Sequence, residues 1–457
     1  MKVSDLLKVH VDDVALGGKA IARHEGRVVF IDQGVPGDDL EVTVTRVKRS
    51  FAEARLERLE RPSPLRVPAP CPHVDRCGGC RLQSLSYPEQ CRVKERQVGE
   101  ALRHIGGLTP EVRPLRPAPE VFHYRNKMEF SFHPGERGEP VLGLHERGTF
   151  DRVFALETCL LPSQLSVEIV RATQHFAREH GWRAYDPRLH RGVVRFLVVR
   201  HLTLSDQCAV HLIATSDEIG GLETWAREVA GLSPAVRAVT LGLNPSRAGV
   251  AVSEEERVLL GEGTVTERLL GLEFEVSANA FLQTNSRQAE ALYTAALEAA
   301  RLRGDECVLD LYCGTGTLTL LFARAAREAV GVESVPDAVE RARRNARRNG
   351  IGNARFVEGE ARRILREWAT KARPEAPTPD LVVVDPPRAG LHPRVVARVA
   401  ELRPGRVVYV SCNPATLARD GHDFGALGYT LVEVEPFDLF PHTPHIECVA
   451  RFERAIG

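Results

Sequence analysis

The sequence lacks a long apolar run, has few lysines and carries no net charge. No apolar stretch of its 457 residues is long enough to span a membrane, and residues 1–10 lack the features of a secretory signal peptide. We therefore expect a cytoplasmic protein with no membrane partner. A formal net charge of zero excludes a global attraction to polyanions. Seven of the 61 basic residues are Lys, and the remaining Arg suit phosphate and base contacts in RNA or, equally, a GC-rich genome.

The chain is too long for one hydrophobic core, so two to four domains are expected. Its 43% hydrophobic and 27% charged residues are ordinary for a soluble globular protein. Nothing in the sequence indicates an oligomer or an obligate protein partner, and a monomer is expected. Ten cysteines in an intracellular protein favour metal binding or catalysis over a disulfide framework.

Residues 1–60 alternate short apolar stretches with glycine-containing turns. Short strands at this spacing predict a small β-barrel. Basic residues gather near its end beside Phe51, which indicates either an oligonucleotide-binding surface or a solvated edge strand. The pattern 17–22 followed by Pro36-Gly37-Asp38 resembles a TRAM domain, an RNA-binding barrel of the OB type.

A cluster of three cysteines, Cys71, Cys77 and Cys80, follows a Pro- and Arg-rich linker at 61–70. Two glycines before Cys80 allow a tight backbone, so that the thiolates can face one ion or cluster. We therefore favour metal binding over packing. The fourth ligand of a tetrahedral site is open among His73, Cys91 and Cys159, and the spacing does not decide between zinc and an iron–sulfur cluster.

The segment from 61 to 265 predicts a central α+β domain. Residues 89–105 predict an amphipathic helix, and 124–132 predict a strand in which basic and aromatic residues alternate. Such a strand suits a substrate-facing sheet, although an exposed antiparallel strand explains it equally well. The strands and helices between 160 and 265 reveal no chemistry of their own.

Residues 266–457 alternate regularly between strand and helix, which predicts a doubly wound, mostly parallel sheet. The first strand–helix turn, Asp310 to Thr317, places Gly314 where the backbone can approach a ligand. Glu333 ends the next strand, where a carboxylate can bind both ribose hydroxyls. The turn lacks the pattern of a dinucleotide site, so S-adenosyl-L-methionine is the favoured nucleoside cofactor.

A thiol and two carboxylates are expected at one edge of this sheet. Cys412 follows the predicted strand 405–411, Asp385 ends the strand before it, and Glu447 lies beside a strand near the C-terminus. Ligands of open α/β sheets bind at the carboxyl ends of the strands. A free cysteine is more often a small buried hydrophobe, but three polar groups aimed at one edge favour a functional Cys412.

With these residues in place, the chain resembles the RNA (uracil-5-)-methyltransferase family, and within it the branch that modifies 23S rRNA. The resemblance covers nearly the whole chain in order: the TRAM-like start, the cysteine cluster, 281–285, 310–316, 385–388, 411–420 and 438–447. It implies a class I methyltransferase domain at 266–457 and a [4Fe-4S] cluster on Cys71, Cys77, Cys80 and Cys159. It also implies that residues 89–120 pack with the C-terminal domain.

The resemblance assigns roles to residues of this sequence. It implies that Cys412 is the nucleophile and Glu447 the base, with Arg125 and Phe281 on the substrate side. Cofactor positions match Gln283, Tyr312, Glu333, Glu360 and Asp385. One departure is Pro387, where the rRNA branch has Ala, and it leaves the choice of target RNA open.

The predicted activity is methyl transfer from S-adenosyl-L-methionine to C5 of a uridine in 23S rRNA through a covalent adduct of Cys412 with C6. Modification of tRNA is the alternative that keeps this chemistry. Asp385-Pro386-Pro387 also resembles the catalytic motif of amino-group methyltransferases, whereas the context of Cys412 matches cytosine-5 methyltransferases poorly. A non-catalytic RNA-binding factor with the same fold is the alternative from another class.

Overall fold

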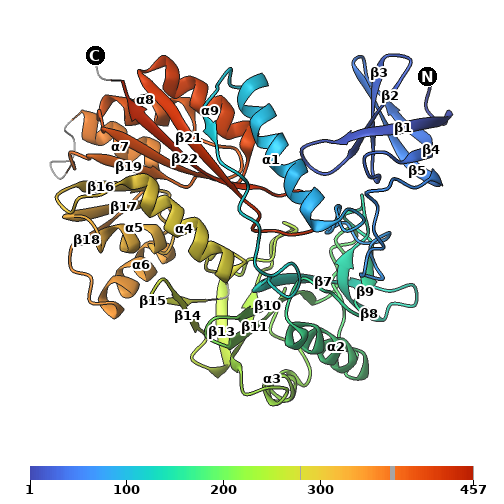
Figure 1. Ribbon diagram of the computed structural model, residues 1–457. Helices are drawn as coiled ribbons and strands as arrows, with labels where there is room; N and C mark the ends of the chain where they lie inside the picture. The colour runs from blue at the N-terminus through green and yellow to red at the C-terminus, as the bar shows by residue number, and fades with distance from the viewer. Residues whose placement is uncertain (278, 371–375, 456–457) are drawn as a thin grey trace.

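The computed structural model describes residues 1–277, 279–370 and 376–455. The remaining residues (278, 371–375 and 456–457) fall within the predicted C-terminal domain and lie outside the described part. Figure 1 shows a small barrel at the N-terminus, a central sheet below it and a larger C-terminal sheet beside it. The multidomain α/β prediction is thereby confirmed.

The N-terminal domain is a closed barrel with the strand order β1-β2-β3-β5-β4. Its strands are β1 (Leu6–Val14), β2 (Ala20–His24), β3 (Arg27–Ile31), β4 (Asp39–Val47) and β5 (Phe51–Arg61). Alternate residues of each strand turn inward and form a separate apolar core, as a period of two requires. The predicted small barrel is confirmed.

The central domain is built on a seven-stranded sheet with the order β13-β12-β11-β10-β7-β8-β9. The strands are β7 (Lys127–Pro134), β8 (Pro140–His145), β9 (Val153–Ala155), β10 (Val194–Leu202), β11 (Gln207–Ala214), β12 (Val236–Leu243) and β13 (Glu255–Gly261). Helices α2 (Gln164–Glu179) and α3 (Leu222–Gly231) contact each other and cover one face with an apolar core. A ribbon of β14 (Val265–Leu269) and β15 (Leu272–Val276) leads into the C-terminal domain.

The C-terminal domain contains an eight-stranded sheet with the order β18-β17-β16-β19-β20-β22-β21-β6. Its strands are β16 (Cys307–Leu311), β17 (Glu328–Glu333), β18 (Ala354–Glu358), β19 (Leu381–Val384), β20 (Arg406–Ser411), β21 (Tyr429–Phe437), β22 (Glu447–Arg454) and β6 (Glu111–Val112). The strands from β18 to β20 are parallel, while β22 runs antiparallel to both of its neighbours.

Helices cover both faces of this sheet, which makes it doubly wound. One face carries α4 (Ser286–Ala300), α5 (Thr317–Ala323) and α6 (Pro336–Arg348). The other carries α7 (Ala361–Ala369), α8 (Pro393–Glu401) and α9 (Pro414–Ala426). In the described residues, no helix combines the length and the apolar character needed to cross a membrane.

The segment that follows the barrel crosses to the C-terminal domain before the central domain begins. Helix α1 (Tyr87–His104) lies against α9, as Figure 1 shows, and its Val98 and Leu102 enter the core beneath α7 to α9. Strand β6 then pairs in parallel with β21. The N-terminal part of the chain therefore completes the C-terminal sheet.

Candidate active site

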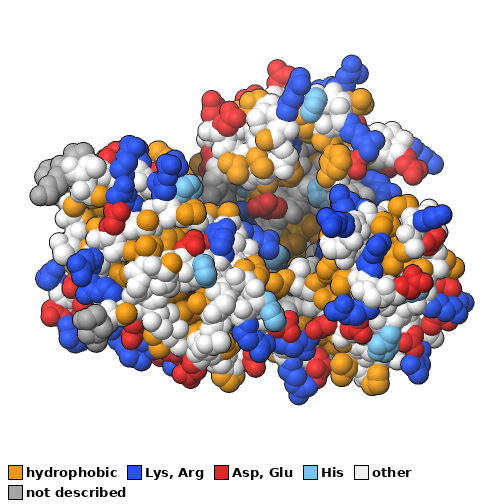
Figure 2. All heavy atoms as spheres, turned by 90° about the horizontal axis from the view of Figure 1, so that it is seen from above, with side chains coloured by type: hydrophobic (Ala, Val, Ile, Leu, Met, Phe, Trp, Pro, Cys, Tyr) orange, Lys and Arg blue, Asp and Glu red, His pale blue; other side chains and the backbone are white. Residues whose placement is uncertain are grey.

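Strand pairing brings Cys412 and Glu447 together. Strands β20 and β22 are antiparallel neighbours with Ser411 opposite Cys448, so the next pair outward is Cys412 and Glu447. Opposed side chains of an antiparallel pair point to the same side. Asp385 follows β19, the parallel neighbour of β20, and all three side chains line one cavity of about 620 Å³. Figure 2 shows a deep hollow with Lys and Arg side chains on its rim.

The two carboxyl groups and the thiol of this cavity favour their neutral forms. Burial raises the pKa of Glu447 well above its usual value and that of Asp385 to about 7. Burial, followed by the charges of Glu447 and Asp385, raises the pKa of the Cys412 thiol to about 12. Arg388 acts in the opposite direction on Cys412 and Glu447, so it favours a thiolate. Arg388 belongs to a motif noted in the sequence, but it had no assigned role.

The first strand–helix turn holds Glu333 at the same edge of the sheet. Tyr312 and Gly314 have positive φ angles of 68° and 54°, which fold the chain back sharply after β16. The Gly314 N–H donates to Glu333 Oε2 at 3.1 Å, and the N–H groups of Ser334 and Val335 donate to Oε1 at 2.6 and 2.9 Å. Glu333 and Tyr312 both line the cavity, which places the predicted ribose-binding carboxylate within it.

Asp310 is a buried acid of the cavity that sequence reasoning left without a role. Its Oδ2 accepts a hydrogen bond from Thr319 Oγ1 at 2.6 Å, while Oδ1 has no partner among the described residues. Burial raises its pKa to about 7. An acidic residue inside an otherwise apolar strand was the available signal, because such a group is rarely buried without a ligand or partner.

The remaining predicted cofactor residues are split between two places. Gln283 is buried and lines the cavity. Glu360 is not among the described residues that line it. Its carboxylate pairs with Arg362 at 3.3 Å, although its charge contributes to raising the pKa of the Tyr312 phenol to about 12. Burial is the larger cause of that shift.

Arg125 and Phe281 lie between the cavity that Cys412 lines and a second one of about 740 Å³, and they line both. The Phe281 side chain is 65% exposed, which is unusual for a large apolar residue and leaves its ring free to stack. The two residues predicted for the substrate side therefore occupy the junction of two cavities.

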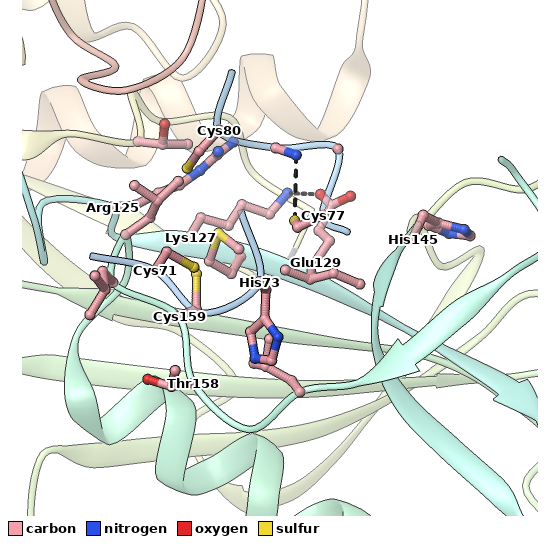
Figure 3. A pocket seen from close by; sticks show the side chains of 18 of the residues that line it. Cys71, His73, Cys77, Cys80, Arg125, Lys127, Glu129, His145, Thr158 and Cys159 are labelled. Atoms are coloured by element: carbon pink, nitrogen blue, oxygen red, sulfur yellow. Dashed lines mark hydrogen bonds and ion pairs between the residues drawn. The ribbon is translucent and has the colours of Figure 1, made fainter. Parts of the chain in front are cut away.

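The second cavity gathers the predicted cysteine ligands (Figure 3). Cys71, Cys77, Cys80 and Cys159 line it together with His73, whereas Cys91 lies on α1 and does not. The Gly79 N–H donates to Cys77 Sγ at 3.4 Å. Of the three candidates for a fourth ligand, Cys159 and His73 therefore share the cavity.

These cysteines are free thiols. Burial raises the pKa of Cys80 to about 12 and that of Cys159 to about 11, and the thiols of the cavity add to both shifts. As the side chains stand in the described part of the chain, no group of three or more His, Cys, Asp or Glu residues is arranged to hold a metal ion. The four thiols thus share a cavity and do not form a closed ion site.

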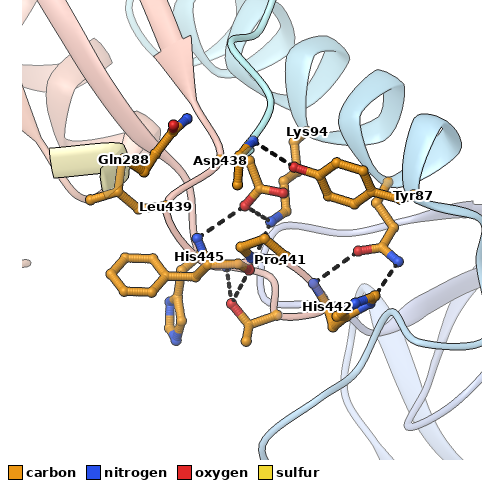
Figure 4. Close-up of polar contacts among 12 residues, drawn as sticks. Tyr87, Lys94, Gln288, Asp438, Leu439, Pro441, His442 and His445 are labelled. Atoms are coloured by element: carbon orange, nitrogen blue, oxygen red, sulfur yellow. Dashed lines mark hydrogen bonds and ion pairs between the residues drawn. The ribbon is translucent and has the colours of Figure 1, made fainter. Parts of the chain in front are cut away.

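The segment from 438 to 445, which leads into Glu447, is held by buried polar contacts (Figure 4). Lys94 Nζ of α1 donates to Asp438 Oδ1 at 2.7 Å, and both side chains are fully buried. Tyr124 Oη donates to the Pro441 carbonyl at 3.0 Å. Asn285, the N-cap of α4, donates to the Leu439 carbonyl at 3.0 Å. Three distant parts of the chain therefore fix the approach to Glu447.

Comparison with known proteins defines the class and then the family. Residues 3–56 match the family model of the TRAM domain, and residues 86–455 match the model described as tRNA (Uracil-5-)-methyltransferase. An uncharacterized RNA methyltransferase of Nitratidesulfovibrio vulgaris is 41% identical over 450 residues, which cover 97% of this chain and 95% of that protein. An uncharacterized RNA methyltransferase of Halalkalibacterium halodurans is 37% identical over 452 residues, which cover 98% of this chain and 97% of that protein.

A solved structure agrees with these matches. The tRNA (uracil-54, C5)-methyltransferase of Pyrococcus abyssi, in complex with S-adenosyl-L-homocysteine, superposes with a TM-score of 0.78. It is 28% identical and covers 97% of this chain and 99% of its own. The fold is thus that of a methyltransferase that carries a TRAM domain. The chain belongs to the RNA (uracil-5-)-methyltransferase family, and the family predicted from its motifs is confirmed.

Proposed function

We propose that this protein transfers a methyl group from S-adenosyl-L-methionine to C5 of a uridine in 23S rRNA through a covalent adduct. The observation that carries the proposal is the pairing of Cys412 with Glu447 across β20 and β22, beside a cavity that also holds Glu333. With both side chains on one side of the sheet, Cys412 can attack C6 of the uracil ring while Glu447 removes the proton from the adjacent C5.

The reaction needs covalent activation because C5 of uracil is a weak nucleophile. The Cys412 thiol gives its proton to solvent water, with Arg388 favouring the thiolate, and the sulfur forms a bond with C6. The electron pair of the C5–C6 double bond makes C5 nucleophilic, and S-adenosyl-L-methionine supplies the methyl group that C5 takes up. Glu447 in its carboxylate form then removes the proton from C5, the double bond re-forms, and the bond between C6 and Cys412 breaks. The raised pKa of Glu447 makes the carboxylate a stronger base once it is formed. The uridine must leave its stack for this, and the exposed Phe281 ring offers a replacement surface.

The polar lining of the cavity fits the cofactor. Asp310 presents a buried oxygen that has no partner among the described residues, which suits a cationic amino group. Glu333 suits the ribose hydroxyls. Tyr312, Gly314, Gln283 and Asp385 complete the proposed cofactor residues. We retain Glu360 as the least supported member because it lies outside the lining.

We also propose a [4Fe-4S] cluster on Cys71, Cys77, Cys80 and Cys159. Four free thiols around one cavity supply the donor set that such a cluster requires. A structural role suits it, because Cys159 lies far along the chain from the other three. Iron and acid-labile sulfide analysis of anaerobically purified protein tests this. About four of each per chain supports the cluster, with loss in Cys159→Ala and retention in the control Cys91→Ala, whereas zinc without sulfide contradicts it.

Transfer RNA is the second candidate substrate. The Pyrococcus abyssi protein, similar over its whole length, is described as acting on tRNA, and Pro387 departs from the rRNA branch. The four cysteines favour the rRNA branch, since the tRNA-specific branch is expected to lack them.

Mass spectrometry of nucleosides decides between the two substrates. Anaerobically purified enzyme is incubated with isotopically labelled S-adenosyl-L-methionine and, separately, with unmodified 23S rRNA, 16S rRNA and tRNA. Labelled 5-methyluridine in 23S rRNA alone is the expected result. Labelled 5-methyluridine in tRNA alone would show that tRNA is the substrate and that the proposed chemistry is right. A labelled N-methylated purine would indicate an amino-group methyltransferase. Tight RNA binding without any product would indicate a non-catalytic factor.

Two substitutions test the assigned roles. Cys412→Ala is expected to abolish turnover while RNA binding persists. Glu447→Gln is expected to leave a methylated covalent adduct that migrates as a protein–RNA band on a denaturing gel, because the C5 proton can no longer be removed. If Cys412→Ala stays active and Glu447→Gln forms no adduct, the assignment is wrong.

A further inference from the structure

Two basic side chains of the central sheet face the second cavity. Lys127 in β7 and Arg200 in β10 are directly opposite each other in the antiparallel register. They lie on the face of the sheet opposite to α2 and α3, since the neighbouring Met128 and Val199 belong to the apolar core. Both line the cavity, and Figure 3 shows Lys127 reaching into it. Arg200 had no role assigned from the sequence, because it lies in a mostly apolar strand.

Arg200 is buried with part of its guanidinium unused. Its side chain is 1% exposed, and Nη2 donates to the Ala280 carbonyl at 2.6 Å. Its Nε and Nη1 find no hydrogen-bond partner in the described ranges of the chain. The nearest carboxylates have other partners: Glu129 pairs with Lys127 at 2.8 Å, and Glu267 accepts from Ser286 at 2.6 Å. A buried cation with unmade hydrogen bonds is costly unless a ligand completes them.

The unused guanidinium lies beside the catalytic cavity. Arg125, Phe281, Leu282 and Thr284 line both cavities, so the two cavities adjoin and share one wall. Arg200 also holds the carbonyl of Ala280, the residue before the exposed Phe281. With a nucleotide at Cys412, the neighbouring nucleotides of the strand are expected at this junction, next to the wall that carries Lys127 and Arg200.

We propose that Lys127 and Arg200 form a subsite for a backbone phosphate of the RNA, next to the nucleotide that enters the catalytic cavity. This inference rests on the proposed function, since it takes RNA as the substrate. A guanidinium has a planar fork that matches phosphate oxygens, and Lys127 adds a mobile point charge. Phosphate oxygens supply the acceptors that Arg200 does not find in the described part of the chain, and they compete with Glu129 for Lys127.

The test is the salt dependence of RNA binding, measured by filter binding with unmodified 23S rRNA and tRNA transcripts. Lys127→Met removes one charge at a half-buried position, and Arg200→Lys keeps the charge but removes the fork. Arg237→Met is the matched control, because Arg237 is an exposed residue of β12 in the same sheet and lines neither cavity. Loss of one phosphate contact is expected to reduce the slope of log Kd against log salt by about 0.7 to 0.9.

We expect Lys127→Met to show this reduced slope and a Kd raised about three- to tenfold at low salt, with KM affected more than kcat. Arg200→Lys is expected to raise Kd at an unchanged slope. Slopes and Kd values equal to those of Arg237→Met would overturn the proposal. Lost iron at an unchanged slope would also overturn it, since the basic residues would then serve the cysteine site.

Failure of the proposed function has a different signature. It appears as wild-type protein that makes no 5-methyluridine, whatever the binding slopes of the variants. A reduced slope in Lys127→Met together with inactive wild type would keep the phosphate subsite and reject the reaction.

Discussion

Replacing Glu447 with Gln is expected to make Cys412 react faster with an alkylating reagent, although the same change stops turnover. The Glu447 carboxylate raises the pKa of the Cys412 thiol, and Gln has the same shape without the charge. A lower thiol pKa means more thiolate at a given pH, and the thiolate is the reactive form. The prediction therefore tests the electrostatics of the pair without RNA or cofactor.

The size of the effect follows from the strand register. Groups on opposed residues of an antiparallel pair lie roughly 6 Å apart, and two unit charges at that distance repel by about 3 kcal/mol at an effective dielectric constant of about 20. This corresponds to about two pKa units. Because a thiolate of lower pKa is intrinsically less nucleophilic, about half of the logarithmic gain is lost, which leaves roughly a tenfold faster reaction.

The effect must depend on pH in a defined direction. Burial raises the pKa of Glu447, so at low pH the wild-type carboxyl is neutral and resembles Gln. The ratio of the variant rate to the wild-type rate should therefore be near one in acid. It should rise as the pH increases through the pKa of Glu447, where the wild-type carboxylate acquires its charge.

The assay is iodoacetamide labelling from about pH 6 to about pH 9.5, with the Cys412 peptide quantified by mass spectrometry. Glu453→Gln is the matched control. It removes the same charge as Glu447→Gln, from a residue of the same strand that lies about 20 Å from Glu447. A ratio of one for Glu447→Gln at every pH, or the same rise for Glu453→Gln, would refute the reasoning.

Three further predictions concern other parts of the site. Between pH 5 and pH 8, the free energy of unfolding of the wild type should fall by about 3 kcal/mol relative to that of Asp310→Asn. The raised pKa of Asp310 favours the folded state while the carboxyl is protonated, and this contribution is lost as the pH rises through about 7; urea unfolding at both pH values measures it. Lys94→Met should cost about 3–5 kcal/mol because Asp438 is left buried and unpaired, and the double change with Asp438→Leu should recover most of it in the same measurement. Phe281→Ala should raise KM for RNA by an amount equivalent to about 1–3 kcal/mol of lost stacking without changing the unfolding midpoint, whereas Phe281→Trp should retain binding.

Much of the fold was predictable because local patterns determine it. Each of the parallel strands β16 to β20 is a short, mostly apolar run, so its position followed from the sequence. Strand β6 was not predicted, because two residues carry no periodic signal. Helix α9 runs from Pro414 to Ala426, although Gly421 and Gly425 disfavour a helix. The buried Phe424 packs against the sheet, and this tertiary contact outweighs the weak local preference.

The site was predictable to the extent that its residues stand at strand ends. Cys412 and Asp385 follow neighbouring parallel strands and were expected at one edge. The antiparallel insertion of β22 that sets Glu447 opposite Cys412 is a non-local pairing, and strand patterns do not specify pairing partners. Lys94 and Arg200 were missed for a related reason. Their burial depends on what packs over them, and charged residues in a helix or strand are normally assigned to the surface.

The position of Glu447, the proposed base, therefore depends on parts of the chain outside its own domain. The segment before Glu447 receives hydrogen bonds from Lys94 on α1 and from Tyr124 near the start of the central sheet. Asn126 in turn donates to the carbonyl of Gln283, which ties the central domain to the loop of Phe281. Because these bonds are buried, they are strong and costly to break. Helix α1 thus helps to position the proposed base, although it lies ahead of the central domain in the chain.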